Sequence, residues 1–159
     1  MGIEVRWMKL STKGRYGLRA MIDLADYSEE MPQSIANIAA RQSISDSYLE
    51  QLMAKLKKAG LIKSIRGAQG GYVLAKKSNE ISVGDILRAL EGDLTPVKCS
   101  ELDGNNGCSG IDCCVTKNVW KRINDSIQEA VDGIHLSELV EDNRKIRMSA
   151  DKELSNCEI

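Results

Sequence analysis

The sequence contains no phenylalanine, and its aromatic side chains are limited to two tryptophans and four tyrosines. A core without phenylalanine has to be built from leucine, isoleucine, valine, alanine and methionine, which favours helices. No apolar run reaches the roughly 18 residues of a membrane-spanning helix, so we expect no membrane partner. Residues 1–7 lack the apolar stretch of a signal peptide, which predicts a cytoplasmic protein.

Histidine is almost absent as well, since His135 is the single histidine in 159 residues. Histidine is the side chain that enzymes use most often for general acid–base catalysis. No nucleophile–base or acid–base pair stands out elsewhere in the sequence. We therefore expect no catalytic residues and no small-molecule substrate, and we predict a binding function.

The net charge of −1 is divided unevenly along the chain. Residues 1–77 hold 13 Lys/Arg and 7 Asp/Glu, whereas residues 78–159 hold 9 Lys/Arg and 16 Asp/Glu. Solvated charged faces alone could give such a difference. A basic half next to an acidic half is also typical of proteins in which one half binds a polyanion.

Capping serines and apolar spacing predict three helices in the basic half, at residues 13–27, 34–41 and 45–59. One face of the third helix is polar, and the other carries an apolar stripe of Leu49, Leu52, Met53 and Leu56. Two short helices in succession, the second with such a polar face, are typical of a helix-turn-helix motif.

A β-hairpin is predicted directly after these helices. Residues 61–65 and 72–75 are β-prone, and the glycine-rich turn 66–71 (RGAQGG) separates them. The turn is not a nucleotide phosphate loop, because it lacks the Gly-Lys-Ser/Thr ending and opens no helix. Its position identifies the hairpin as a wing. The predicted fold is mainly α with a small β-hairpin wing: a winged helix-turn-helix domain plus a long C-terminal helix.

The polar face of the third helix and the wing tip form the predicted DNA-binding surface. In the major groove, glutamine pairs with adenine, serine contacts several bases and lysine pairs with guanine, whereas arginine favours narrow minor grooves. The alternatives are an exposed face without a ligand and a winged domain that binds protein. The basic half and the Gly-Arg wing tip favour DNA, with the following contact residues: Ser45, Ser47, Tyr48, Gln51, Lys55, Arg66 and Gly67.

Four of the five cysteines lie within sixteen residues, in a loop rich in Gly, Asn and Asp. They are Cys99, Cys108, Cys113 and Cys114, and the fifth is Cys157. In a chain expected in the cytoplasm, such a cluster indicates a metal or redox site rather than disulfides. Thiolates suit both iron–sulfur clusters and zinc, but the spacing is not that of common zinc sites. Free thiols are the remaining alternative.

Further helices are predicted in the acidic half. Ser82 and Asp85 form a capping box before a short helix, and an apolar stripe from Val119 to Val131 predicts a long one. The expected division is a winged domain (8–91), a cysteine-rich loop (92–115), a dimerisation helix with the following turn (116–140) and a flexible tail (141–159).

Several segments resemble the IscR-like transcription regulators, the family of IscR, NsrR, RirA and CymR. They are residues 8–16 (MKLSTKGRY), 47–52 (SYLEQL), 66–72 (RGAQGGY), 107–116 (GCSGIDCCVT) and 136–140 (LSELV), together with Trp120. The resemblance extends from Met8 to Val140 and leaves the first seven residues outside it. It implies a winged helix-turn-helix homodimer that binds a pseudo-palindromic double-stranded DNA operator.

The resemblance also implies a 2Fe–2S cluster bound through Cys99, Cys108 and Cys114, although the interval from Cys99 to Cys108 is longer than in the best-known members. The fourth ligand departs from the family pattern. Lys117 stands where IscR has a histidine, and Arg15 stands where NsrR has an aspartate. Neither cation can ligate iron. The remaining candidates are Cys113, which is chemically the best, Asp112 and His135.

The function predicted on these grounds is a DNA-binding regulator whose binding is modulated by the cluster and which controls iron–sulfur cluster biogenesis genes. Two alternatives stay open. One is a regulator of the same family that senses thiol oxidation, nitric oxide or zinc. The other, from a different class, is a metal-binding interaction protein whose winged domain binds protein.

Overall fold

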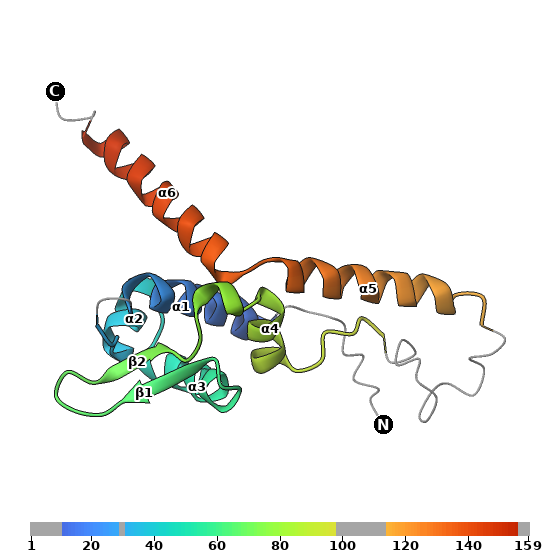
Figure 1. The fold of residues 1–159 in the computed structure, drawn as a ribbon, viewed down its shortest axis with the longest axis horizontal. Coiled ribbons are helices and arrows are strands. Elements are labelled where there is room, and N and C mark those ends of the chain that lie inside the picture. Colours follow the sequence, from blue (N-terminus) through green and yellow to red (C-terminus); the bar gives the residue numbers. More distant parts are fainter. Residues whose placement is uncertain (1–10, 29–30, 98–113, 156–159) are drawn as a thin grey trace.

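The computed structural model describes residues 11–28, 31–97 and 114–155, with side chains as far as residue 150. In chain order the elements are α1 (Thr12–Tyr27), α2 (Ile35–Gln42), α3 (Asp46–Lys58), β1 (Ile62–Ile65), β2 (Gly71–Leu74), the 3-10 helix η1 (Ser78–Glu80), α4 (Val83–Glu91), α5 (Lys117–Gly133) and α6 (Leu136–Ser155). Helices α1 to α4 and the hairpin form one body, from which α5 and α6 extend as two arms (Figure 1). No helix in the described ranges is long and apolar enough to cross a membrane.

Serine side chains begin four of the helices. The hydroxyl oxygen of each accepts a hydrogen bond from a backbone N–H in the first turn, which satisfies a donor that the helix itself leaves unpaired. These N-cap residues are Ser11 of α1, Ser34 of α2, Ser45 of α3 and Ser82 of α4. The three helices predicted in the basic half and the capping box at Ser82 are therefore confirmed.

The core lies between α1, α2, α3 and α4 and includes the start of α6. Leu49, Leu52, Met53 and Leu56 of α3 are all buried in it, as their spacing predicts. Helix α1 approaches α4 closely because residue 17 has no side chain. A Cβ atom on Gly17 would lie 2.1 Å from Cδ1 of Leu90, so a larger residue would have to displace this buried side chain.

The wing is an antiparallel two-stranded hairpin in which Ile62 pairs with Leu74 and Ile65 pairs with Gly71. Gln33, just before α2, joins it as an isolated bridge, because its backbone exchanges hydrogen bonds with Tyr72 at 2.9 and 2.8 Å. The wing is thus hydrogen-bonded to the helix-turn-helix as well as following it in sequence. The predicted winged helix-turn-helix fold is confirmed.

The structure differs from the sequence prediction at the C-terminal end. Residues from 141 onward were expected to form a flexible tail, but α6 continues to Ser155. The helix begins with Leu136 and Val140 buried in the core, and the polar residues that follow include Arg144 and Arg147, which both bond Asp26 on α1. The sequence does not predict this packing, because residues that form ion pairs with a distant helix give no apolar stripe.

Candidate nucleic-acid interface

The N-terminal half of α3 presents two of the predicted base-reading residues to solvent. Ser47 and Gln51 are exposed and lie one helical turn apart, and their side chains make no hydrogen bond within the part of the chain that the structure describes. Ser45 is the N-cap, and its hydroxyl oxygen accepts from the backbone N–H of Tyr48 at 3.3 Å. The side chains of Ser47 and Gln51 are therefore available for base edges.

Two other predicted contact residues of α3 already have partners in the chain. Tyr48 is half-buried, its hydroxyl lies 3.3 Å from Oγ1 of Thr12, and its ring meets the ring of Tyr16 edge-on at 6.0 Å. Lys55 donates from Nζ to the backbone oxygen of Leu90 at 3.0 Å. Both side chains thus hold α3 against its neighbours, and a direct DNA contact by either stays a prediction.

The wing tip has the geometry that a close approach to DNA requires. Arg66 and Gly67 are exposed, and Gly67 has a φ of 125°, a backbone conformation that only glycine adopts without strain. The base of the wing is tied to α3, since Nζ of Lys57 donates to Oγ of Ser64 at 2.7 Å. This bond fixes the strand that leads to Arg66 relative to α3.

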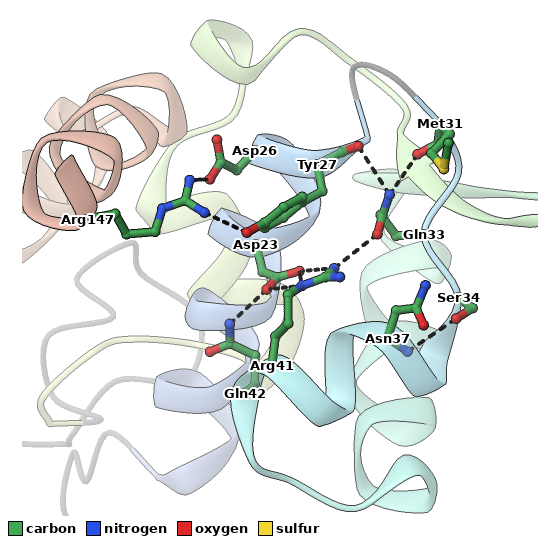
Figure 2. A network of polar contacts seen from close by, with 10 residues as sticks. All are labelled: Asp23, Asp26, Tyr27, Met31, Gln33, Ser34, Asn37, Arg41, Gln42 and Arg147. Atoms are coloured by element: carbon green, nitrogen blue, oxygen red, sulfur yellow. Dashed lines mark hydrogen bonds and ion pairs between the residues drawn. The ribbon is translucent and has the colours of Figure 1, made fainter. Parts of the chain in front are cut away.

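A buried carboxylate holds α2 against α1. Asp23 accepts three hydrogen bonds from Arg41, with Nε at 2.9 Å from Oδ2 and 3.1 Å from Oδ1 and Nη2 at 2.6 Å from Oδ1, and a fourth from the Gln42 amide at 2.9 Å (Figure 2). This carboxylate raises the pKa of Arg41, so the guanidinium stays charged. Arg41 also donates to Oε1 of Gln33 at 3.0 Å. The network therefore includes Gln33, whose backbone pairs with the wing.

A second carboxylate connects the C-terminal arm to the same region. Asp26 on α1 accepts from Nε of Arg144 at 2.6 Å and from Arg147, whose other nitrogen donates to the hydroxyl of Tyr27 at 2.6 Å. The Tyr27 ring is flanked by the guanidinium groups of Arg147, 5.3 Å away, and Arg41, 4.2 Å away (Figure 2). Helix α6 is therefore joined to α2 through a single aromatic ring.

The C-terminal end of α4 holds both α1 and α3. Oε1 of Glu91 accepts from the backbone N–H of Ser11 at 3.0 Å, from the Ser11 hydroxyl at 2.6 Å and from the backbone N–H of Gly14 at 2.8 Å. One residue earlier, the backbone oxygen of Leu90 accepts from Lys55. The chain leaves for the cysteine-rich segment directly after this junction.

Cys114 is the one predicted cysteine ligand that lies among the described residues, whereas Cys99, Cys108 and Cys113 lie outside them. Its thiol is exposed, and Sγ lies 3.2 Å from Oγ1 of Thr116 at the start of α5. Hydrogen bonds from the Thr116 side chain and backbone lower the pKa of Cys114, and the charge of Lys117 lowers it further. The lysine in the family's ligand position thus favours the thiolate electrostatically.

His135, a fourth-ligand candidate, is separated from Cys114 by the whole of α5. That helix has 17 residues, which corresponds to a length of about 25 Å. Within one chain, the two residues therefore cannot bind the same cluster. No group of three His, Cys, Asp or Glu residues in the described ranges is placed to hold a metal ion, a search that does not reach Cys99, Cys108 or Cys113.

Sequence reasoning missed the face of α1 that flanks α3. Thr12, Tyr16 and Arg19 follow one another at intervals of four and three residues, so they share one side of the helix. That spacing was available in the sequence. The contact of this face with α3 could not be predicted, because nothing in the local pattern shows that the ring of Tyr48 turns toward α1.

The chain matches known regulators over most of its length. The Rrf2 family, described as iron-dependent transcriptional regulators, matches residues 10–142. The HTH-type transcriptional regulator IscR of Pectobacterium carotovorum is 42% identical over 146 residues, which covers 92% of this chain and 87% of the relative. IscR of Aliivibrio salmonicida is 44% identical over 89% of this chain and 83% of its own length.

Solved structures agree with the sequence relatives. IscR of T. potens is 47% identical with a TM-score of 0.67, covering 85% of this chain and 88% of that one. CymR, the global cysteine regulator of B. subtilis, is 44% identical with a TM-score of 0.69, covering 84% of this chain and 96% of that one. The winged helix-turn-helix, the polar face of α3 and these relatives place the chain in the Rrf2 family, as an IscR-like, non-enzymatic DNA-binding transcription regulator.

Proposed function

We propose that this chain regulates iron–sulfur cluster biogenesis genes, with its DNA binding modulated by a 2Fe–2S cluster. The observation that carries the proposal is the environment of Cys114. Its thiolate is favoured by Thr116 and Lys117, and thiolates are the form in which cysteine binds iron. The names of the IscR relatives and the iron-dependent description of the family support the same assignment.

The proposed ligands are Cys99, Cys108 and Cys114, with Cys113 as the candidate for the fourth position. Asp112 is the alternative within the same segment, and His135 could serve only from the partner subunit. A bound cluster supplies a group that is sensitive to iron supply and oxidants. The end of α4 connects the cysteine-rich segment to the DNA-binding domain, because Glu91 bonds α1 and the backbone oxygen of Leu90 bonds α3.

We also propose that two chains pair through α5. None of its residues is buried, and its apolar stripe is open to solvent, with Val119 53% and Ile123 39% exposed. Oδ1 of Asn124, on the same helix, is buried without a hydrogen-bond donor among the described residues. A second copy would cover the stripe and give a two-fold symmetric dimer suited to a pseudo-palindromic operator, with half-sites about 34 Å apart.

In this dimer each α3 would enter a major groove and each wing an adjacent minor groove. Ser47 and Gln51 would read base edges, and Arg66 would enter the narrow groove. Replacing Gln51 by Ala should weaken operator binding by about 1–3 kcal/mol and relax one operator position. An equal loss on every duplex sequence would assign Gln51 to the phosphate backbone instead.

The experiment that tests the cluster is anaerobic reconstitution with iron and sulfide, followed by visible absorption spectroscopy and operator binding. Cys99→Ala, Cys108→Ala and Cys114→Ala should each lose the cluster absorption, and Cys157→Ala should keep it. Cys113→Ala decides the fourth ligand, since loss assigns it to Cys113 and retention leaves Asp112 or the partner's histidine. Wild-type protein that binds no iron and sulfide would contradict the proposal.

A second candidate, thiol oxidation, is favoured by the same exposed Cys114, because low-pKa, accessible thiols are the ones that oxidise. It predicts that peroxide changes operator binding of the iron-free protein and that Cys114→Ala removes the effect. Under the cluster proposal, peroxide leaves DNA binding of iron-free protein unchanged.

A further inference from the structure

The guanidinium of Arg19 is held in place without a carboxylate to neutralise it. Its Nε donates to Oε1 of Gln42 at 3.0 Å, and its Nη2 donates to the backbone oxygen of Gln42 at 3.5 Å. Its Cζ lies 5.6 Å from the centre of the Tyr16 ring. Among the described residues no carboxylate lies within ion-pair distance of it, although the side chain is restrained from two sides.

This combination distinguishes Arg19 from the other restrained arginines in the described ranges. Each of those has an acidic partner: Asp23 for Arg41, Asp132 for Arg88, and Asp26 for both Arg144 and Arg147. A guanidinium has five N–H donors, and Gln42 uses two of those of Arg19. The other three make no hydrogen bond within the described part of the chain.

The position of Arg19 indicates which anion this is. Gln42 is the last residue of α2, three residues before the N-cap of α3. Tyr16, which lies under the guanidinium, packs edge-on against Tyr48 in the first turn of α3. Arg19 therefore flanks the end of the recognition helix that enters the major groove, where the phosphates of one strand border the groove.

We propose that Arg19 contacts a backbone phosphate beside the half-site and thereby positions α3 in the groove. Contacts to phosphates set the register of a protein on DNA, and base contacts specify the sequence. An arginine already held by Gln42 and Tyr16 loses little conformational freedom when it makes this contact. The inference rests on α3 being the recognition helix, as proposed above.

The test measures operator and non-specific duplex binding of the full-length protein as a function of salt, for wild type, Arg19→Gln and Arg19→Lys. The matched control is Arg122→Gln, which removes the same charge from an exposed position on α5. We expect Arg19→Gln to weaken both duplexes by a similar factor, on the order of tenfold at physiological salt. The slope of log Kd against log salt should fall by about 1.8 per dimer, because each neutralised phosphate contributes about 0.9.

Arg19→Lys retains the charge and should restore the salt slope, whereas Arg122→Gln should leave affinity and slope at wild-type values. An unchanged slope in Arg19→Gln, or the same change in Arg122→Gln, would overturn the proposal. A loss of affinity for the operator alone, together with a lower urea midpoint, would also overturn the proposal, because a purely structural role of Arg19 predicts that result. Gln51→Ala, measured in parallel, tests the recognition-helix assignment separately. If α3 reads base edges, this variant changes the operator preference and keeps the wild-type salt slope.

Discussion

Helices α3 and α5 both carry an apolar stripe at helical spacing, but the surroundings of the two stripes differ. All four apolar residues of the α3 stripe are buried, at most 1% exposed, between α1, α2 and α4. On α5 no residue is buried, and contacts with the body are concentrated on α4. The winged domain thus completes its core within one chain, and α5 does not. The comparison teaches that the same sequence pattern builds a core in one place and leaves an uncovered apolar surface in the other.

The largest expected effect comes from breaking the complete core. Replacing Leu49 by Ala should lower the free energy of unfolding by about 2–5 kcal/mol, because it removes a fully buried side chain and leaves a cavity. Urea unfolding followed by circular dichroism measures the change. Ile146→Ala on α6, where the side chain is 68% exposed, is the matched control and should cost under about 0.5 kcal/mol. Equal effects would mean that α3 is not the centre of the core.

A smaller loss should follow when the polar part of the winged domain is broken. Asp23→Ala leaves Arg41 without its carboxylate, and we expect a cost of about 1.5–3 kcal/mol, the range for hydrogen bonds to charged groups. Asp142→Ala is the control, because Asp142 and Lys145 are 66% and 71% exposed and such pairs contribute about 0–1 kcal/mol. If both variants unfold at the wild-type urea concentration, the network does not stabilise the domain.

The smallest effect on folding, and the sharpest test of the comparison, is expected on α5. Ile123→Asn should change the stability of the winged domain by under about 0.5 kcal/mol. It should raise the dimer dissociation constant by roughly thirtyfold, because the two subunits together lose on the order of 2 kcal/mol of apolar burial. Sedimentation velocity over a concentration series measures this, with Lys121→Asn as the control on the same helix. A dimer of unchanged affinity would place the interface elsewhere.

Local signals in the sequence predicted the elements of the winged domain. Serines at helix starts, the apolar stripe of α3 and the glycine-rich turn act through neighbours a few residues away, so they can be recognised without the fold. The contacts that arrange those elements could not be predicted in this way. Asp26 bonds Arg147, 121 residues later, and Lys55 bonds a backbone oxygen 35 residues later.

The candidate site divides along the same line. Ser47, Gln51, Arg66 and Gly67 are exposed as expected, because the amphipathic pattern of α3 and the turn chemistry of the wing place them locally. Tyr48 and Lys55 belong to the same polar face in sequence, but tertiary contacts engage both with other helices. The local pattern does not single out Arg19 either, because its partner Gln42 lies on another helix.

The bridge between Ser82 and His135 has a consequence for how this regulator can vary. Val83 donates to the backbone oxygen of Ile134, and Leu136 donates to that of Ile81, both at 2.9 Å, so the chain returns to the place that it left. The 52 residues between the two bridge positions therefore start and end at one place, and the first of them form α4, which packs in the core. Doubling the length of a flexible connection costs only about 0.6 kcal/mol, so a few inserted or deleted residues cost far less. We therefore expect a change in the interval between Cys99 and Cys108 to cost the winged domain little free energy of unfolding.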